Sequence, residues 1–123
     1  MLNDRVSPRV LIVDDERVIA DTLAVILSYK GFSTTAVYSG ERAVEAASEL
    51  RPNFLISDVV MGAMSGIEAA IIISESVPEC RILLFSGNAA TNDLLRHAQS
   101  EGFQFELLAK PVHPQIIVDH LNA

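Results

Sequence analysis

The sequence predicts an α/β protein built on a doubly wound, five-stranded parallel sheet with helices on both faces. Short β-branched runs alternate five times with amphipathic stretches along the 123 residues. This regular alternation favours right-handed β-α-β crossovers and therefore a parallel sheet. The first, third and fourth runs are apolar throughout, which is typical of strands that are buried on both faces.

The first strand and helix carry the clearest pattern. "RVLIV" at 9–13 is a continuous apolar run, and Gly31 supplies a helix end. Between them, the stretch 16–30 has helical periodicity. Its apolar face is made by Ile19, Leu23, Ile26 and Leu27.

The same strand and helix unit recurs four times along the rest of the chain. Ile71, Ile72 and Ile73 cannot all face inward on one helix, which indicates a wide core face or, alternatively, a partner patch. The further expected strands are "STTAV" (33–37), "NFLIS" (53–57), "RILLF" (81–85) and "FELLA" (105–109), followed by helices near 41–50, 66–77, 90–101 and 114–121.

Length and composition indicate a single globular domain over residues 1–123. Half of the residues are hydrophobic and 20% are charged. The apolar runs are far too short to cross a bilayer, and the polar start "MLNDRVSPR" lacks the apolar core of a signal peptide. We therefore expect a cytoplasmic protein without a membrane partner.

The net charge of −7 disfavours direct binding to nucleic acid or anionic lipid, so proteins and cations are the expected partners. The single cysteine, Cys80, cannot form an internal disulfide and has no CxxC spacing, which favours a small apolar filler. The histidines show no ligand spacing, and we expect ordinary surface or half-buried side chains at His97, His113 and His120.

Polar residues gather where the expected strands end. In parallel sheets of this kind, ligands bind in the crevice at the carboxyl ends of the strands. The loops after the strands therefore predict one common site. Its candidate residues are Asp14, Asp15 and Glu16 after the first strand, Asp58 after the third, Ser86 with Gly87 and Asn88 after the fourth, and Lys110 with Pro111 after the fifth.

Several carboxylates at one edge require a cation. Each close pair repels by about 4 kcal/mol at roughly 4 Å and an effective dielectric of about 20. Lys110 supplies one positive charge, and a divalent ion supplies more. An all-oxygen ligand set without nearby His or Cys suits Mg²⁺.

An aspartate in such a site can accept a phosphoryl group as an aspartyl phosphate. Asp58 is the candidate nucleophile, Lys110 and the ion would partly neutralise it, and the Ser86 hydroxyl would hold an equatorial oxygen. Nucleotide sites are disfavoured, because neither GxGxxG nor GxxxxGK[ST] occurs.

Each candidate residue also has a plainer interpretation when it is taken alone. Asp15 or Glu16 could complement a helix dipole, and Asp58 could start a turn. Ser86 could cap a helix, and Lys110 could be a solvated charge before a proline. Their convergence on one edge of the sheet favours the functional interpretation.

Four segments in order and register resemble the receiver domain of response regulators, the phosphoacceptor module of two-component signalling. They are "LIVDDE", "LISDVVMGAMSGIEA", "LLFSG" and "LLAKP". The resemblance covers nearly the whole chain and implies the flavodoxin-like strand order 2-1-3-4-5.

The resemblance also implies roles for individual residues. Asp58 would take phosphate from a histidine kinase phosphohistidine. Asp15, Asp58 and the main-chain carbonyl of Val60 would ligate Mg²⁺, and Asp14 would contact the ion through water. Ser86 and Lys110 would bind the phosphoryl oxygens. The peptide between Lys110 and Pro111 would be cis.

The sequence departs from the family pattern at two positions. Gly62 stands where the family usually has a proline, so we expect a looser loop. Leu107 stands where the family usually carries a Tyr, Phe or His that moves inward on activation. Phe103 and Phe105 are the nearby aromatic alternatives.

The sequence therefore predicts a phosphorylation-controlled receiver that switches a protein interaction and is not a turnover enzyme. The resemblance allows a homodimer through the face of helix 90–101, strand 105–109 and helix 114–121. Met1 and the short tails favour a free-standing receiver, and an excised domain is the alternative. The alternatives are a receiver-like binding module that works without phosphorylation and a true phosphohydrolase, which would need a placed general acid or base.

Overall fold

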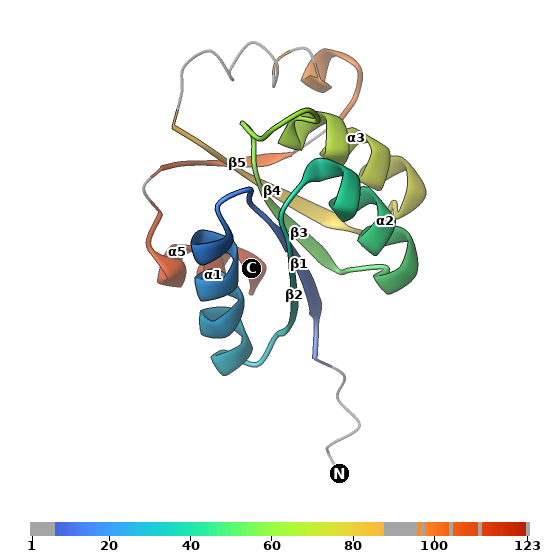
Figure 1. The fold of residues 1–123 in the computed structure, drawn as a ribbon. Coiled ribbons are helices and arrows are strands. Elements are labelled where there is room, and N and C mark those ends of the chain that lie inside the picture. Colours follow the sequence, from blue (N-terminus) through green and yellow to red (C-terminus); the bar gives the residue numbers. More distant parts are fainter. Residues whose placement is uncertain (1–6, 88–95, 97, 104, 111, 123) are drawn as a thin grey trace.

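The computed structural model describes residues 7–87, 96, 98–103, 105–110 and 112–122. A five-stranded parallel sheet with the order β2-β1-β3-β4-β5 forms the centre of the molecule, which confirms the predicted topology (Figure 1). The elements are β1 (Arg9–Val13), α1 (Arg17–Tyr29), β2 (Ser33–Val37), α2 (Gly40–Leu50), β3 (Phe54–Asp58), α3 (Gly66–Ser76), β4 (Arg81–Ser86), β5 (Glu106–Ala109) and α5 (Pro114–Leu121).

These bounds agree with the predicted elements to within a residue or so at each end. The exception is the helix expected near 90–101, most of which lies outside the described residues. Of that segment, residues 96 and 98–100 are helical. Within the described ranges, no helix is long and apolar enough to cross a membrane.

The sheet separates two apolar clusters. Helices α1 and α5 cover one face, and α2 and α3 cover the other (Figure 1). Alternate residues of one strand point to opposite faces, so Leu11 and Val13 join the α2/α3 cluster while Val10 and Ile12 join the α1/α5 cluster. Strands β1, β3 and β4 are buried almost throughout, as their continuous apolar runs predict.

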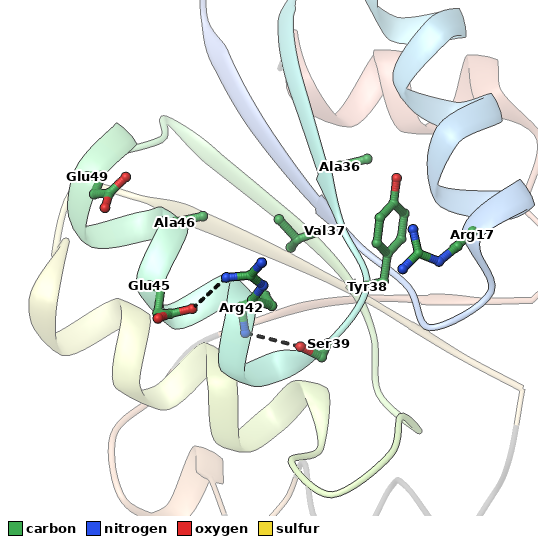
Figure 2. A pocket seen from close by; sticks show the side chains of 9 residues that line it. All are labelled: Arg17, Ala36, Val37, Tyr38, Ser39, Arg42, Glu45, Ala46 and Glu49. Carbon is green, nitrogen blue, oxygen red and sulfur yellow. Dashed lines mark hydrogen bonds and ion pairs between the residues drawn. The ribbon is translucent and has the colours of Figure 1, made fainter.

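Local signals fix the helix ends. Gly31 has a φ of +99°, the left-handed conformation that closes α1. The Ser39 hydroxyl accepts a hydrogen bond from the Arg42 amide at 3.1 Å and so caps α2 (Figure 2). Ser65 and Glu68 form a reciprocal capping box at the start of α3.

On helices α1 and α3, some of the apolar residues are buried and others are exposed. On α1, Leu23 and Leu27 are buried, but Ile19 is 44% exposed. On α3, Ile73 is buried and Ile71 is half-buried, whereas Ile72 is 38% exposed. The α3 pattern agrees with a wide core face. On α1, the outer part of the predicted face remains at the surface.

Gly66 allows α3 to begin directly against β3. A Cβ atom at this position would overlap the main-chain carbonyl oxygen of Asp58. The Gly66 amide donates a hydrogen bond to the Val59 carbonyl at 2.8 Å, which closes the loop between β3 and α3. The absence of a side chain at Gly66 therefore fixes the backbone that carries Asp58.

We predict that Gly66→Ala destabilises the protein by about 1 to 3 kcal/mol, the usual cost of overpacking. The matched control is Gly62→Ala in the same loop, because a Cβ at Gly62 meets nothing within 4 Å. Urea unfolding would measure both variants. Equal midpoints for the two would contradict the close contact between Gly66 and Asp58.

Candidate functional site

The parallel register brings the polar residues of four strand ends to one edge of the sheet. Val13 pairs with Ser57, so the following residues, Asp14 and Asp58, lie on neighbouring strands. Asp58 itself pairs with Phe85, which places Ser86 one position further along β4. Ser86 pairs with Ala109, the residue before Lys110.

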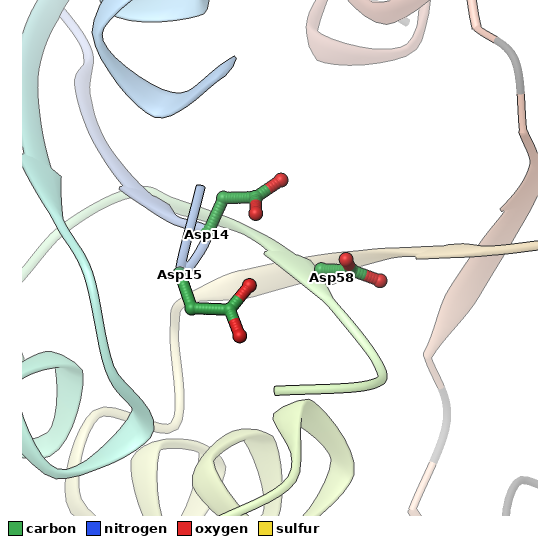
Figure 3. Close-up of side chains that lie close together, drawn as sticks. All are labelled: Asp14, Asp15 and Asp58. Atoms are coloured by element: carbon green, nitrogen blue, oxygen red, sulfur yellow. The ribbon is translucent and has the colours of Figure 1, made fainter. Parts of the chain in front are cut away.

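Asp14, Asp15 and Asp58 form a compact acidic cluster. Each of them offers a carboxylate oxygen, and these oxygens lie within 4.8 Å of one another (Figure 3). Asp14 is buried, Asp15 is exposed, and the Asp58 side chain is 12% exposed. The cluster is therefore open to solvent on the side of Asp15.

Lys110 is the cation that pairs with this cluster. Its Nζ donates a hydrogen bond to Asp58 Oδ2 at 2.7 Å. The lysine backbone is held as well, because its amide donates to the Ser86 carbonyl at 3.0 Å. The structure thus brings Lys110 from β5 to the end of β3, as the sequence predicts.

The pKa values of Asp14 and Lys110 reflect these surroundings. Burial raises the pKa of the Asp14 carboxyl, and Asp58 raises it further, although the hydrogen bond from the Glu16 amide acts in the opposite direction. Burial lowers the pKa of Lys110, but its hydrogen bond to Asp58 and the charge of that carboxylate outweigh burial and raise it overall. Lys110 is therefore protonated at neutral pH.

The donor set fits Mg²⁺. The cluster supplies three carboxylates, and Lys110 balances only one negative charge. Oxygen donors at this spacing, with one exposed side for waters, are what a small hard cation requires. Asp14, Asp15 and Asp58 are the side chains that would hold the ion.

Two other predicted site residues lie beside the cluster. Ser86 is buried at the end of β4, next to Lys110 in the sheet. The Val60 amide points toward Asp58 Oδ1 at 3.4 Å, while the Val60 side chain is exposed. The described hydrogen bonds that close this loop do not involve Gly62, and the looser loop expected there stays a prediction.

Several other residues singled out in the sequence are not shown to be members of the cluster. Glu16 precedes α1, where its carbonyl accepts the first helical hydrogen bonds and its carboxylate makes no capping bond. His113 caps α5 through Nδ1, and His120 lies 3.5 Å from Glu106. Asn88, His97 and Pro111, and with Pro111 the expected cis peptide, lie outside the described residues.

Cys80 is confirmed as an apolar filler. It is 8% exposed in the α2/α3 cluster, and burial raises the pKa of its thiol to about 12. A thiol with so high a pKa is protonated at neutral pH and is a poor nucleophile.

The aromatic alternatives to Leu107 lie away from the acidic cluster. Phe103 and Phe105 lie before the amino end of β5, whereas Lys110 follows its carboxyl end. The two rings stack with their centroids 6.0 Å apart. Leu107 is half-buried against the α2/α3 cluster and pairs with Leu84. No aromatic side chain among the described residues takes the place of the usual switch residue on β5.

Sequence reasoning missed the role of Gly66. The residue lies within the quoted segment "LISDVVMGAMSGIEA", but nothing marked it as more than a helix start. A glycine just after the Ser65 cap was the available signal. Only the three-dimensional approach of α3 to β3 shows what that glycine is for.

A doubly wound sheet with an aspartate cluster and a lysine at its carboxyl edge is typical of domains that accept a phosphoryl group on aspartate. Residues 10–122 match the family described as "Response regulator receiver domain". The chain belongs to this family, whose members are phosphoacceptors of two-component signalling and partners of histidine kinases.

The similar curated proteins are longer than this chain. The chain is 28% identical over 122 residues to the DNA-binding response regulator MtrA of Mycobacterium tuberculosis, which covers 98% of the chain and 51% of MtrA. It is 30% identical over 114 residues to the probable transcriptional regulatory protein TcrX of the same species, covering 93% of the chain and 48% of TcrX. The chain thus spans about half the length of these relatives.

Solved structures agree with the fold. A two-component transcriptional regulator AraC from Clostridium phytofermentans superposes with a TM-score of 0.78 at 31% identity, covering 94% of this chain and 90% of that one. The chemotaxis protein CheY4 of Vibrio cholerae gives a TM-score of 0.83 at 24% identity, covering 95% and 98%. The CheY4 likeness supports the fold alone.

We predict that Asp14→Asn stabilises the metal-free protein at neutral pH by about 1 kcal/mol, because it removes one of the mutually repelling charges. Asparagine can still accept the hydrogen bond from the Glu16 amide. The folded state raises the pKa of Asp14, so the contribution of this group to wild-type stability is lost as pH rises from the ordinary value of 3.8 through the raised one. The advantage of the variant should therefore appear over that rise in pH.

Urea unfolding in chelator at several pH values would measure this effect. Glu75→Gln, which removes an exposed charge on α3, is the control and should show no such gain. A variant that is less stable than wild type above the raised pKa would contradict the predicted repulsion.

We predict that millimolar Mg²⁺ raises the melting temperature, because an ion that binds only the folded state stabilises it by mass action. The rise should shrink in Asp15→Asn and persist in Asp119→Asn, which changes an exposed acid on α5. Equal rises in wild type and Asp15→Asn would place the ion elsewhere.

Proposed function

We propose that the chain is a phosphorylation-controlled signalling receiver in which Asp58 takes a phosphoryl group from a phosphohistidine and slowly loses it to water. The donor would be a sensor histidine kinase or a phosphotransfer protein. The observation that carries the proposal is the 2.7 Å contact of Lys110 with Asp58 beside two further carboxylates. This role implies a cytoplasmic location, without direct binding to nucleic acid.

In the transfer step, a carboxylate oxygen of Asp58 forms a bond to phosphorus while the bond from phosphorus to the histidine nitrogen breaks. The electron pair of that bond stays on the imidazole, which keeps or takes up a proton. Bound Mg²⁺ would supply positive charge next to the transferred oxygens. The ligands proposed for it are Asp15, Asp58 and the Val60 carbonyl, with Asp14 acting through water.

Lys110 and Ser86 would hold the phosphoryl group after transfer. The Lys110 ammonium already lies against Asp58 and can follow the new negative charge with a small side-chain movement. Ser86 would donate its hydroxyl to a second phosphoryl oxygen. We assign no general base to the pocket, so hydrolysis should be slow.

We place the docking site of the donor in a groove that leads to this pocket. A groove of about 800 Å³ between α1 and α5 has Asp14 and Lys110 at its polar end. Val18, at 78% exposure, and Ile19, at 44%, lie along it. The polar end belongs to the proposed phosphoacceptor site and the rest is apolar apart from Thr22, so the groove suits an amphipathic helix that presents a phosphohistidine.

The output surface would lie on the other side of α5. The family places it on the helix expected near 90–101, β5 and α5, and a homodimer would use the same face. Leu107 offers no large ring to reorient, so this response should rest on a backbone shift after Lys110 is drawn to the phosphate.

We predict that incubation with Mg²⁺ and a small phosphodonor gives one acid-stable, base-labile phosphate, which is absent from Asp58→Asn. Asp119→Asn, which removes an exposed aspartate outside the pocket, should label like wild type. Intact-mass and stability measurements of the labelled protein would test this. Persistent labelling of Asp58→Asn would sink the assignment, and no labelling of the folded wild type would favour the phosphorylation-independent binding module.

We predict that Val18→Asp slows transfer from a phosphorylated histidine phosphotransfer protein at least tenfold and leaves labelling by the small phosphodonor unchanged. A buried charge would disfavour an apolar contact with the donor helix. The control is Ile72→Asp on α3, which lies across the sheet from the groove. If Ile72→Asp alone slows transfer, the donor docks on the other face.

A further inference from the structure

An arginine at the start of α1 is held by an aromatic ring beside the acidic cluster. Arg17 is the first residue of α1, and its Cζ lies 4.1 Å from the centroid of the Tyr38 ring (Figure 2). The Tyr38 hydroxyl donates a hydrogen bond to Asp21 Oδ1 at 2.6 Å. Tyr38 therefore connects the first turns of α1 with the end of β2.

This is an unusual place for a cation. The amino end of a helix carries partial positive charge, which disfavours arginine there. Helical side chains also lean toward the amino end of their helix. In α1 that direction leads to the loop with Asp14 and Asp15, the latter being separated from Arg17 by a single residue. Without the ring, acidic residues that are close in sequence could bind the Arg17 guanidinium: Asp15 and Glu16 before it, and Asp21 one helical turn after it.

A guanidinium bound to Asp15 would compete with a metal ion. Arginine forms two-pronged hydrogen bonds with carboxylates, using the same oxygens that Mg²⁺ needs. Asp15 is the exposed member of the cluster and so the one within easiest reach of a surface side chain. The stack on the aromatic face attracts the guanidinium electrostatically and so biases which partner Arg17 takes.

We propose that Tyr38 is a positioning residue for the metal site: it holds Arg17 away from Asp15 and keeps the acidic cluster available to Mg²⁺. The proposal rests on the proposed function, because it assumes that the cluster binds this ion. It assigns a role to two residues that supply no ligand and lie outside the cluster.

Arg42 provides a contrast in the same region. Arg17 and Arg42 both line a surface pocket of about 610 Å³ beside β2 (Figure 2). Arg42 pairs with Glu45 at 3.3 Å on its own helix, and the two side chains are 75% and 67% exposed. Arg42 thus has a carboxylate partner outside the cluster, whereas Arg17 has the ring.

The test is Mg²⁺ affinity measured by calorimetry at low ionic strength on folded, unphosphorylated protein. Tyr38→Leu removes the ring but keeps an apolar side chain, and Tyr38→Phe keeps the ring but removes the hydroxyl. The double variant Arg17→Gln/Tyr38→Leu removes both the ring and the competing charge. Arg42→Gln is the charge-matched control in the same pocket.

We expect Tyr38→Leu to weaken Mg²⁺ binding about fivefold, the effect of about 1 kcal/mol of competition by one nearby charge. The double variant should regain wild-type affinity or exceed it, and Tyr38→Phe and Arg42→Gln should stay within twofold of wild type. A purely structural role for Tyr38 predicts no rescue by Arg17→Gln. Wild-type affinity in Tyr38→Leu, or an equal loss in the double variant, would overturn the proposal.

A variant pair that leaves Tyr38 intact covers the case in which Tyr38→Leu does not fold. Arg17→Lys keeps the charge on a flexible stem that stacks less well, so it should bind Mg²⁺ more weakly than Arg17→Gln by more than twofold. Equal affinities of these two variants would overturn the proposal. Absence of Mg²⁺ binding in the wild type would instead refute the proposed function.

Discussion

Repulsion among the carboxylates of Asp14, Asp15 and Asp58 is the constraint on which the rest of this structure depends. The three are held within 4.8 Å of one another, an arrangement that costs folding free energy in the absence of a cation. The surrounding apolar clusters must supply that free energy, and Lys110 offsets only part of it. Binding of a divalent ion would relieve this repulsion, and the proposed phosphorylation of Asp58 would add negative charge that the ion and Lys110 would have to balance.

The sheet provides the rigidity for this arrangement. Asp14, Asp58 and Lys110 sit at or just after the ends of three different strands, and the parallel ladder determines which residues meet. Strands β1, β3 and β4 are buried on both faces, so the positions of their ends vary little. A shift of one residue in the pairing of β1 with β3 would turn Asp14 or Asp58 away from the cluster.

Most of the fold and the acidic cluster could be predicted from the sequence, because both depend on local patterns. The apolar run "RVLIV" predicts a strand, and the acids that follow it predict where the strand ends, whatever segments pack against it. The contact of Gly66 with Asp58, the stacking of Arg17 on Tyr38 and the exposure of Ile19 depend instead on how separate elements pack. Such contacts produce no periodic pattern of apolar residues in the sequence, so they could not be predicted from it. The ion pair between Lys110 and Asp58 was an intermediate case, since topology alone implied the proximity.

The start of α3 packs closely against β3 and so limits the directions in which the backbone around Asp58 can move. On that side of Asp58 the backbone has no spare volume, because Gly66 already touches the carbonyl of Asp58 and the capping box of Ser65 and Glu68 fixes the first turn. If Asp58 is phosphorylated as we propose, we expect the resulting displacement to be taken up across the sheet, toward β4 and β5. The close packing of α3 on β3 would therefore decide which surface moves, because only the opposite side of Asp58 has room to do so.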